Sequence, residues 1–496
     1  MGWFGLFLLV LALALMMTTG WPTYAVLLGV CSAGTLVAVA SGSVDVAVLG
    51  SLPDRIVGLL DRDLLQALAL YALVGALLNQ LTLAGSLYSG LHKLFGRRLP
   101  RVAPELGGLG LGLLLAPMNG SVGASLMTLA RTAGAEWAAE GRPAARRTAM
   151  IALASTLGVI VPPSLVLLLL GDAMLQAHTE GMNLARTMGL PQAEAAIRVV
   201  NTQDILQAAL VPGAALLLCW VALLLVTVPR GPVARSHGTT RLLRRERIAL
   251  CVVPLVIVLL LSLVTIGRVR AVEAAAAAGV LLLGWGAASG RLKPALMRRV
   301  LDDAMALTGA LFALLLAATS FSLLLRVLGT DRLAVELMRP LEGRPVLATL
   351  TVLLVMLACA FVLDAFELIF LVVPVVMPPL LAQVDDAAWV ATLTLLALQA
   401  GFLLPPFGYA VVLARGLTVP RPPAKAVFAV LLPYLVGLFA VMAWVMTTPS
   451  STHWLRTAPP TLAPEKTLSP DQIDELMREM GTPPEDAPPE VPPAER

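Results

Sequence analysis

The chain has 496 residues, of which 58% are hydrophobic and only 13% are charged. This composition is too apolar for a soluble globular domain, so it predicts a membrane protein. The net charge is +4, and the basic excess lies in loops between apolar runs, a pattern that gives no indication of a nucleic acid partner.

The four cysteines fall inside apolar runs, and the four histidines lie outside them without clustering. This distribution predicts no disulfide framework, no histidine-based metal site and no bound cofactor. A membrane-embedded enzyme would need clustered acids, histidines or a metal motif at the membrane face, and the sequence contains none. We therefore predict that the chain is not an enzyme.

Apolar runs long enough to cross a bilayer follow one another along the chain, which predicts a polytopic membrane protein. The first two spans are expected at 3–17 and 23–49, and the third at about 64–83. The segment from His92 to Arg101 is strongly basic, so we expect it on the cytoplasmic side.

The next apolar stretch, about residues 105–134, is interrupted by Pro117 and by Asn119-Gly120-Ser121. Basic segments flank it on both sides, which places both flanks in the cytoplasm. A segment that enters and leaves on one side is a re-entrant hairpin, with its tip at Asn119-Gly120-Ser121. The alternative is one ordinary helix with a proline kink, which would not keep both basic loops inside.

Residues 148–171 are expected to form a broken helix, because they contain Gly158-Val159-Ile160-Val161-Pro162-Pro163-Ser164. Paired prolines have no backbone N–H and push the preceding residue out of helical geometry. Such a break at membrane depth is tolerated only where protein or a polar cavity covers it. Residues 172–204 are expected to be a polar insertion outside the membrane, and 205–228 should cross back, which completes a first half of residues 1–228.

A loop at 229–247 contains six arginines and is the strongest cytoplasmic marker in the chain. The second half, residues 248–447, is expected to begin with two spans, an amphipathic linker at the interface and a third span: 248–266, 271–288, 291–303 and 304–325.

The second half repeats both unusual features of the first. Residues 345–381 are too long for one helix and are interrupted by Asp364, which predicts a second hairpin. Residues 389–414 contain a second broken helix, in which Gly401 to Gly408 shows the same Gly-x-x-x-Pro-Pro spacing 243 residues later. The same offset aligns Ser121 with Asp364.

A final span at 427–446 leads to a tail, 448–496, that is expected to be soluble and is rich in proline and glutamate. The two hairpins should enter from opposite faces. We therefore predict an all-α polytopic membrane protein built as an inverted repeat, with two re-entrant hairpins and two broken transmembrane helices. Broken helices at matching positions of two halves indicate a transporter, with its binding site between the halves near mid-membrane.

Broken helices expose carbonyl groups that suit Na⁺ and N–H groups that suit an anionic solute. In the first half the candidates are side chains of the hairpin tip, carbonyls of the break and nearby hydroxyls: Asn119, Ser121, Gly158, Val161, Ser155, Thr156 and Ser164. The alternatives are that the hydroxyls bond their own backbone, and that Gly158 and Gly401 only allow close helix packing.

In the second half the carboxylates deepest in apolar sequence are Asp364 and Glu367, one helical turn apart. Charges there are expensive and usually functional, although pairing with an arginine for structure is the alternative. Arg326 closes a long apolar run, either as a snorkelling anchor or as an anion-binding residue. Three polar residues inside apolar runs are candidates for hydrogen bonds between helices: Asn79, Gln80 and Gln399.

Together these motifs resemble the large membrane subunit of the tripartite ATP-independent periplasmic (TRAP) transporters. The resemblance covers about residues 5–447. It rests on an ordered set of segments that are similar to the family's third helix, first hairpin, first broken helix, second hairpin and second broken helix: Gly75 to Asn79, Asn119-Gly120-Ser121, Ala154 to Ser164, Leu363-Asp364 and Leu404 to Gly408.

The resemblance implies an elevator-type secondary transporter of the bacterial inner membrane, which imports a small organic acid with a Na⁺ gradient. It implies two partners, a small membrane subunit, expected here as a separate chain, and a periplasmic substrate-binding protein that selects the solute. The first Na⁺ would use Asn119, Ser121, Gly158, Val161 and Pro162, and the second Asp364, Gly401, Leu404 and Pro405. The candidates for solute binding are Ser121, Ser164, Asp364 and Arg326.

The sequence departs from the family pattern where Asn119 replaces a serine, Ala365 follows Asp364 in place of proline, and Leu404 replaces threonine. A backbone carbonyl ligand survives such changes and a hydroxyl ligand does not, so the changes bear most on the second Na⁺ site. Two alternatives stay open, a proton-coupled carrier that uses Asp364 and Glu367, and a membrane assembly subunit that has lost transport.

Overall fold

The computed structural model describes residues 1–42, 50, 53, 56–58, 63–81, 83–115, 121–162, 164–188, 201–228, 244–265, 268–405 and 408–455. Every regular element in these ranges is a helix, which confirms the predicted all-α fold. Six of the helices are long and apolar enough to cross a membrane. There are up to eight spans if two bent helix pairs each count as one span: Leu65–Gln80 with Leu83–Gly96, and Ala144–Ile160 with Leu165–Met188. The tail beyond Leu455 is a second unit and lies outside the described residues, as does most of the loop 229–247.

Two broken helices form the buried centre of the membrane unit, Met1–Leu455. The first consists of α9 (Ala144–Ile160) and α10 (Leu165–Met188), and the second of α19 (Ala387–Leu403) and α20 (Tyr409–Leu417). α9 and α19 have 17 residues each, and they begin and end at positions separated by the same 243 residues. Almost all of their side chains are buried, so protein encloses the helices that lead into both breaks.

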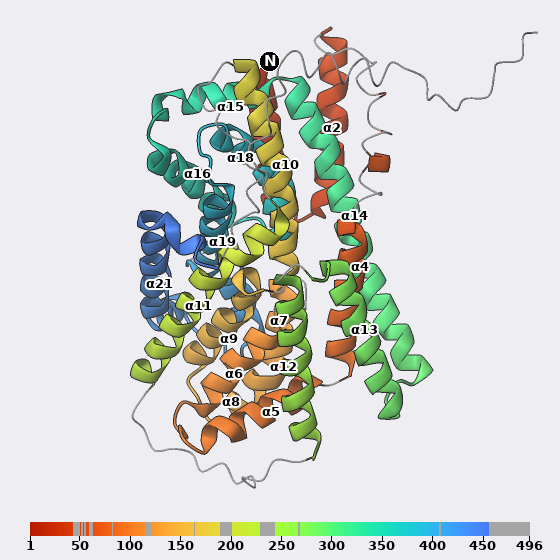
Figure 1. Cartoon of the computed structure of the whole chain (residues 1–496), viewed down its shortest axis with the longest axis vertical. Coiled ribbons are helices and arrows are strands. Elements are labelled where there is room, and N and C mark those ends of the chain that lie inside the picture. Colours follow the sequence, from red (N-terminus) through yellow and green to blue (C-terminus); the bar gives the residue numbers. More distant parts are fainter. Residues whose placement is uncertain are drawn as a thin grey trace, which may run out of the picture. The chain divides into compact units, whose positions relative to one another are not determined.

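A helical hairpin precedes each broken helix, and the two hairpins have corresponding elements. The first comprises α6 (Ala103–Leu115), α7 (Val122–Leu129), a π-helical turn (Ala130–Gly134) and α8 (Ala135–Ala139). The second comprises α16 (Pro345–Cys359), α17 (Ala365–Glu367), a π-helical turn (Leu368–Val372) and α18 (Val373–Leu381). α6 packs against α9 as α16 packs against α19, and Figure 1 shows the first hairpin at the lower end of the view and the second at the upper end.

The other helices surround this centre. α14 packs against α2 and α4, and α13 packs against α4, so these four helices form a group at the right of Figure 1. α11 and α21, which each follow a broken helix, pack against each other and against α19. The bounds of the surrounding helices are α1 Gly2–Thr19, α2 Thr23–Ala40, α4 Asp63–Gln80, α5 Leu83–Gly96, α11 Thr202–Thr227, α12 Arg244–Thr265, α13 Ala271–Ala288, α14 Pro294–Val327, α15 Thr330–Met338 and α21 Ala424–Thr447, followed by a 3₁₀ turn at Pro449–Thr452.

Three helices extend beyond the limits that the sequence predicts. α5 covers part of the predicted basic loop, α10 continues past residue 171 to Met188 into the predicted insertion, and α14 joins the predicted linker and span in one helix. Two of these helices are amphipathic: α5 buries Leu83 and Leu87, and α10 buries Met174 and Ala177 beyond residue 171. Because polar residues alternate with the buried ones, a search for continuous apolar runs does not detect such helices.

The three polar residues predicted between helices each contact another helix. Asn79 of α4 accepts the hydroxyl of Thr128 in α7 at 2.9 Å, and Gln80 donates to Asp303 of α14 at 2.8 Å. The contact of Gln399 in α19 with Thr156 in α9 is longer, at 3.4 Å. These contacts join helices from different parts of the chain and confirm the interpretation of polar residues inside apolar runs.

Candidate functional site

The geometry of the first break follows from its prolines. In a continuous helix the carbonyl of Gly158 would accept the N–H of the residue four places later, but Pro162 has no N–H. α9 accordingly ends at Ile160, and Val161 is extended, with φ −89° and ψ 116°. The hydroxyl of Ser164 donates to the Gly158 carbonyl instead. A carbonyl oxygen has two lone pairs, so the Gly158 oxygen keeps one for a further ligand.

The hydroxyls just before this break are bonded within α9. Ser155 donates to the carbonyl of Ala152 at 2.8 Å, and Thr156 donates to that of Leu153 at 2.9 Å. The predicted alternative, in which these hydroxyls bond their own backbone, is therefore confirmed. Their oxygen atoms keep lone pairs and remain possible acceptors.

Ser121 starts the return arm of the first hairpin. Its backbone is extended, with φ −136° and ψ 149°, and its side chain accepts the N–H of Ala124 at 3.1 Å, which caps α7. α7 packs against α9, so this arm lies beside the first broken helix. Asn119, the other predicted ligand of the tip, lies outside the described residues.

The second break has similar backbone geometry and different side chains. Leu404 is extended, with φ −78° and ψ 114°, close to the angles of the first break. The carbonyl of Gly401 loses its helical donor because Pro405 has no N–H. The repeat offset aligns Ser164 with Phe407, which has no hydroxyl to donate. The two breaks thus offer comparable carbonyls, and only the first has a hydroxyl in the sequence directly after it.

Asp364 and Glu367 form a reciprocal cap at the start of α17. Asp364 Oδ1 accepts the N–H of Glu367 at 2.9 Å, and Glu367 Oε2 accepts the N–H of Asp364 at 3.0 Å. The other oxygen of Glu367 accepts the hydroxyl of Thr23 in α2. Within the described part of the chain, no ion pair joins either carboxylate to an arginine, so the predicted structural alternative is not found there.

The structure adds Tyr409, which no sequence motif indicates. A Cβ atom placed on Gly123, near the start of α7, would lie 2.9 Å from the Tyr409 hydroxyl. Tyr409 begins α20, directly after the second break, and α20 packs against both α7 and α9. The first hairpin and the second broken helix therefore meet beside the first tip, as a site shared by two halves requires.

Arg326 lies apart from the other predicted site residues. It forms an ion pair with Glu180 of α10 and lines a cavity of about 250 Å³ among α10, α14, α15 and α18. Glu180, Asp331 and Arg332 are the other charged residues that line this cavity, and none of the described residues predicted at the tips or breaks does so. The guanidinium has a carboxylate partner, so Arg326 is not simply a snorkelling anchor.

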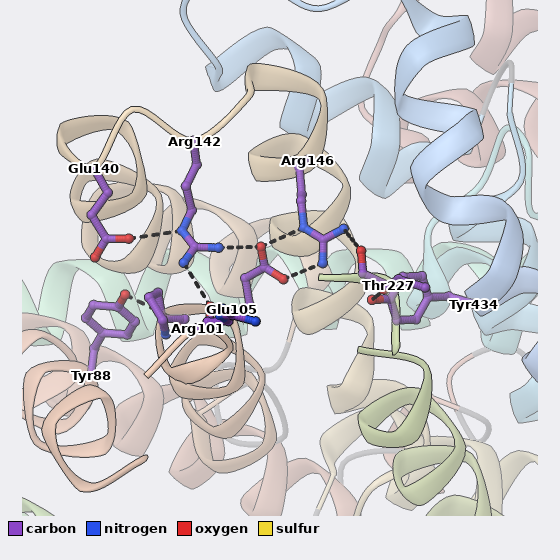
Figure 2. Close-up of polar contacts among 9 residues, drawn as sticks. Tyr88, Arg101, Glu105, Glu140, Arg142, Arg146, Thr227 and Tyr434 are labelled. Atoms are coloured by element: carbon purple, nitrogen blue, oxygen red, sulfur yellow. Dashed lines mark hydrogen bonds and ion pairs between the residues drawn. The ribbon is translucent and has the colours of Figure 1, made fainter. Parts of the chain in front are cut away.

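A buried ion-pair network closes the base of the first hairpin (Figure 2). Glu105, only 1% exposed, accepts hydrogen bonds from Arg146 at 2.6 and 2.7 Å and from Arg142 at 2.7 Å. Arg146 also donates to the carbonyl of Thr227, at the end of α11, at 3.1 Å. The sequence assigns both arginines to a basic loop and gives no signal for their partner, because Glu105 stands at the start of an apolar stretch.

Comparison with known proteins agrees with the resemblance in the sequence. The chain matches the family described as "Tripartite ATP-independent periplasmic transporter, DctM component" over residues 10–451. No curated protein matches the sequence. Among solved structures, it is similar to the crystal structure of the YdaH transporter of Alcanivorax borkumensis, with 16% sequence identity and a TM-score of 0.46, over 82% of this chain and 88% of that chain.

The family match spans both hairpins, both breaks and nearly all of the surrounding helices. It also agrees with the helical content and the candidate spans of the membrane unit. The chain therefore belongs to the DctM family, the large membrane component of the TRAP transporters, and is a component of a transporter and not an enzyme.

Proposed function

We propose that this chain is the permease that carries a carboxylate-bearing solute across the bacterial inner membrane, driven by a Na⁺ gradient. Large components of TRAP transporters work with a small membrane subunit and a periplasmic binding protein. Here the small subunit is a separate chain, and the binding protein selects the solute. The hairpins and broken helices move together past the surrounding helices, in an elevator mechanism.

The observation that carries this proposal is the repeated helix break. At each break the C-terminal end of one helix, with its partial negative charge, faces the N-terminal end of the next, with its partial positive charge. The first end suits a cation and the second an anion, so each break suits a cation together with an anionic group. Uptake of an organic anion together with Na⁺ requires such a pairing.

The proposed Na⁺ ligands are the residues that the resemblance to the family implies. The first Na⁺ binds at the first tip and break, and the second at the corresponding positions of the second half. The ligands of the first Na⁺ are Asn119, Ser121, Gly158, Val161 and Pro162. The ligands of the second Na⁺ are Asp364, Gly401, Leu404 and Pro405. The solute contacts Ser121, Ser164 and Asp364. Arg326 lines a separate cavity and contacts the solute during its passage through the protein.

The test is uptake of radioactive organic acids by proteoliposomes that contain this chain with its two partner proteins. An inward Na⁺ gradient should drive accumulation, and replacing Na⁺ with choline should abolish it. Equal Na⁺ on both sides is the control for binding without transport. Uptake that is unchanged without Na⁺ would refute the coupling, and no uptake under any condition would support the assembly subunit instead.

One observation favours a second coupling ion. Asp364 and Glu367 place two carboxylates side by side at the second hairpin, without an arginine partner in the described ranges. Such a pair can bind a proton, because two adjacent carboxylates do not both ionise readily. Uptake driven by a pH gradient in Na⁺-free medium, and lost in Asp364→Asn, would support this alternative.

A further inference from the structure

The contacts between the two halves include one between equivalent residues. The amide nitrogen of Gln399 in α19 lies 3.4 Å from the hydroxyl oxygen of Thr156 in α9, and the two residues are 243 positions apart, the offset of the repeat. Equivalent residues that contact each other across a two-fold arrangement lie at its axis. Both side chains are 0% exposed. The contact therefore marks a buried point where equivalent positions of the two halves meet.

The polar atoms of this pair are poorly satisfied. The contact is longer than the roughly 2.7–3.2 Å of an ordinary hydrogen bond. The amide oxygen of Gln399 has no hydrogen-bond partner among the described residues. Thr156 cannot supply one, because its hydrogen is donated to the carbonyl of Leu153. Leaving a buried polar group without a partner is destabilising, so a ligand for this oxygen would stabilise the pair.

The electrostatic surroundings favour a cation as that ligand. α9 and α19 end one helical turn beyond the pair, at Ile160 and Leu403. Each C-terminal end carries about half a negative elementary charge from its unpaired carbonyls. Two negative helix ends thus lie close to an unpaired amide oxygen. Oxygen atoms are the ligands that hard cations prefer.

We propose that the Gln399 amide turns its oxygen toward Thr156, and that this oxygen and the hydroxyl oxygen of Thr156 are ligands of a third Na⁺, bound between the two halves and separate from the sites at the breaks. This inference rests on the proposed Na⁺ coupling. The site has one oxygen from each half, so it exists only while α9 and α19 are in contact. Neither side chain titrates near neutral pH, so the site binds a metal cation and does not take up a proton.

The experiment counts bound Na⁺ on the purified full-length chain in lipid nanodiscs, by equilibrium binding of radioactive sodium in choline buffer. Gln399→Met and Thr156→Val keep the side-chain volume and remove the ligand oxygen. Each variant should bind one Na⁺ fewer per chain at saturation than the unaltered protein. Gln399→Glu keeps an oxygen in place and should retain the full number.

Thr394→Val is the matched control, because Thr394 lies on α19, is buried and bonds the carbonyl of Val390 in its own helix. It should bind as many ions as the unaltered chain. Unchanged counts in both Gln399→Met and Thr156→Val would overturn the third site while Na⁺ coupling stands, as expected if the oxygen holds only water. An unaltered chain that binds no Na⁺ would overturn the coupling and this inference together. Two independent variants keep the test decisive if one of them does not fold.

Discussion

The carboxylate of Glu105 is a buried charge that two guanidiniums neutralise. Removing one member of such a group leaves the others without compensation, which costs about 3–5 kcal/mol. Glu105→Gln should therefore lower the free energy of unfolding by about that amount, because Arg142 and Arg146 would face each other without a carboxylate between them. The measurement is the midpoint of thermal unfolding of the purified protein in detergent.

Glu140→Gln is the control for this prediction. Glu140 bonds Arg142 in the same network at 2.9 Å, but its side chain is 22% exposed. Partly exposed ion pairs contribute less than about 1 kcal/mol, so this variant should unfold close to the midpoint of the unaltered protein. Equal shifts in the two variants would show that burial does not set the importance of Glu105.

The sequence predicts the structural surroundings of some residues and not of others. The break at Gly158 is predictable because its cause, the missing N–H of Pro162, lies four residues away. The bond from Arg146 to Glu105 spans 41 residues and depends on how α6 and α9 pack, so no local pattern predicts it. Arg326 shows the same limit, since its position in a separate cavity depends on α10 and α18.

The corresponding elements of the two halves are held by chemically different contacts. Trp389 occupies the position in α19 that Arg146 occupies in α9. Arg146 donates to the carbonyl of Thr227 at the end of α11, and the indole N–H of Trp389 donates to Val445 near the end of α21, at 2.8 Å. The last carbonyls of a helix lack donors within it. Each half therefore ties the start of its broken helix to the last turn of the helix that follows, a pairing that sequence comparison misses because arginine and tryptophan share only an N–H donor.

The second hairpin approaches its broken helix through Gly401. A Cβ atom at this position would collide with Cβ of Ala360, at the end of α16. Both atoms sit close to the backbone, so neither can rotate away, and the helices would have to move apart. Gly401→Ala should destabilise the unit by about 1–3 kcal/mol, as overpacking does, and should weaken stabilisation by Na⁺. Thermal midpoints measured with and without Na⁺ check both effects.

Gly416→Ala provides the comparison for this prediction, because nothing lies within 4 Å of the added methyl group in α20. Alanine has about 0.5–1 kcal/mol better helix propensity than glycine, so this variant should be as stable as the unaltered protein or slightly more stable. If Gly401→Ala were as stable as Gly416→Ala, the close packing of α19 on α16 would not be required for stability. The packing role that the sequence leaves open for Gly401 is already visible in the structure, whereas its role as an ion ligand stays a prediction.

A short connection joins each hairpin to its broken helix, and we call these connections the first corner (residues 139–143) and the second corner (residues 382–386). The two corners lie at opposite ends of the membrane unit. Figure 1 shows the first hairpin at the lower end of the view and the second at the upper end. The first corner adjoins the arginine-rich segment that contains Arg142 and Arg146, while the second contains Asp385 and Asp386 and no basic residue. The positive-inside rule therefore predicts that the first corner lies in the cytoplasm and the second outside.

This orientation predicts the accessibility of two exposed positions, Ala139 in the first corner and Asp385 in the second. With the four native cysteines replaced by alanine, Asp385→Cys should react in intact cells with a maleimide that cannot cross the membrane. Ala139→Cys should react only after the inner membrane is permeabilised, because the reagent otherwise cannot reach the cytoplasm. The cysteine-free chain measures background labelling. Reaction of both positions under the same single condition would place both corners on one side and refute the inverted repeat, on which the opposed helix ends and the shared ion site both depend.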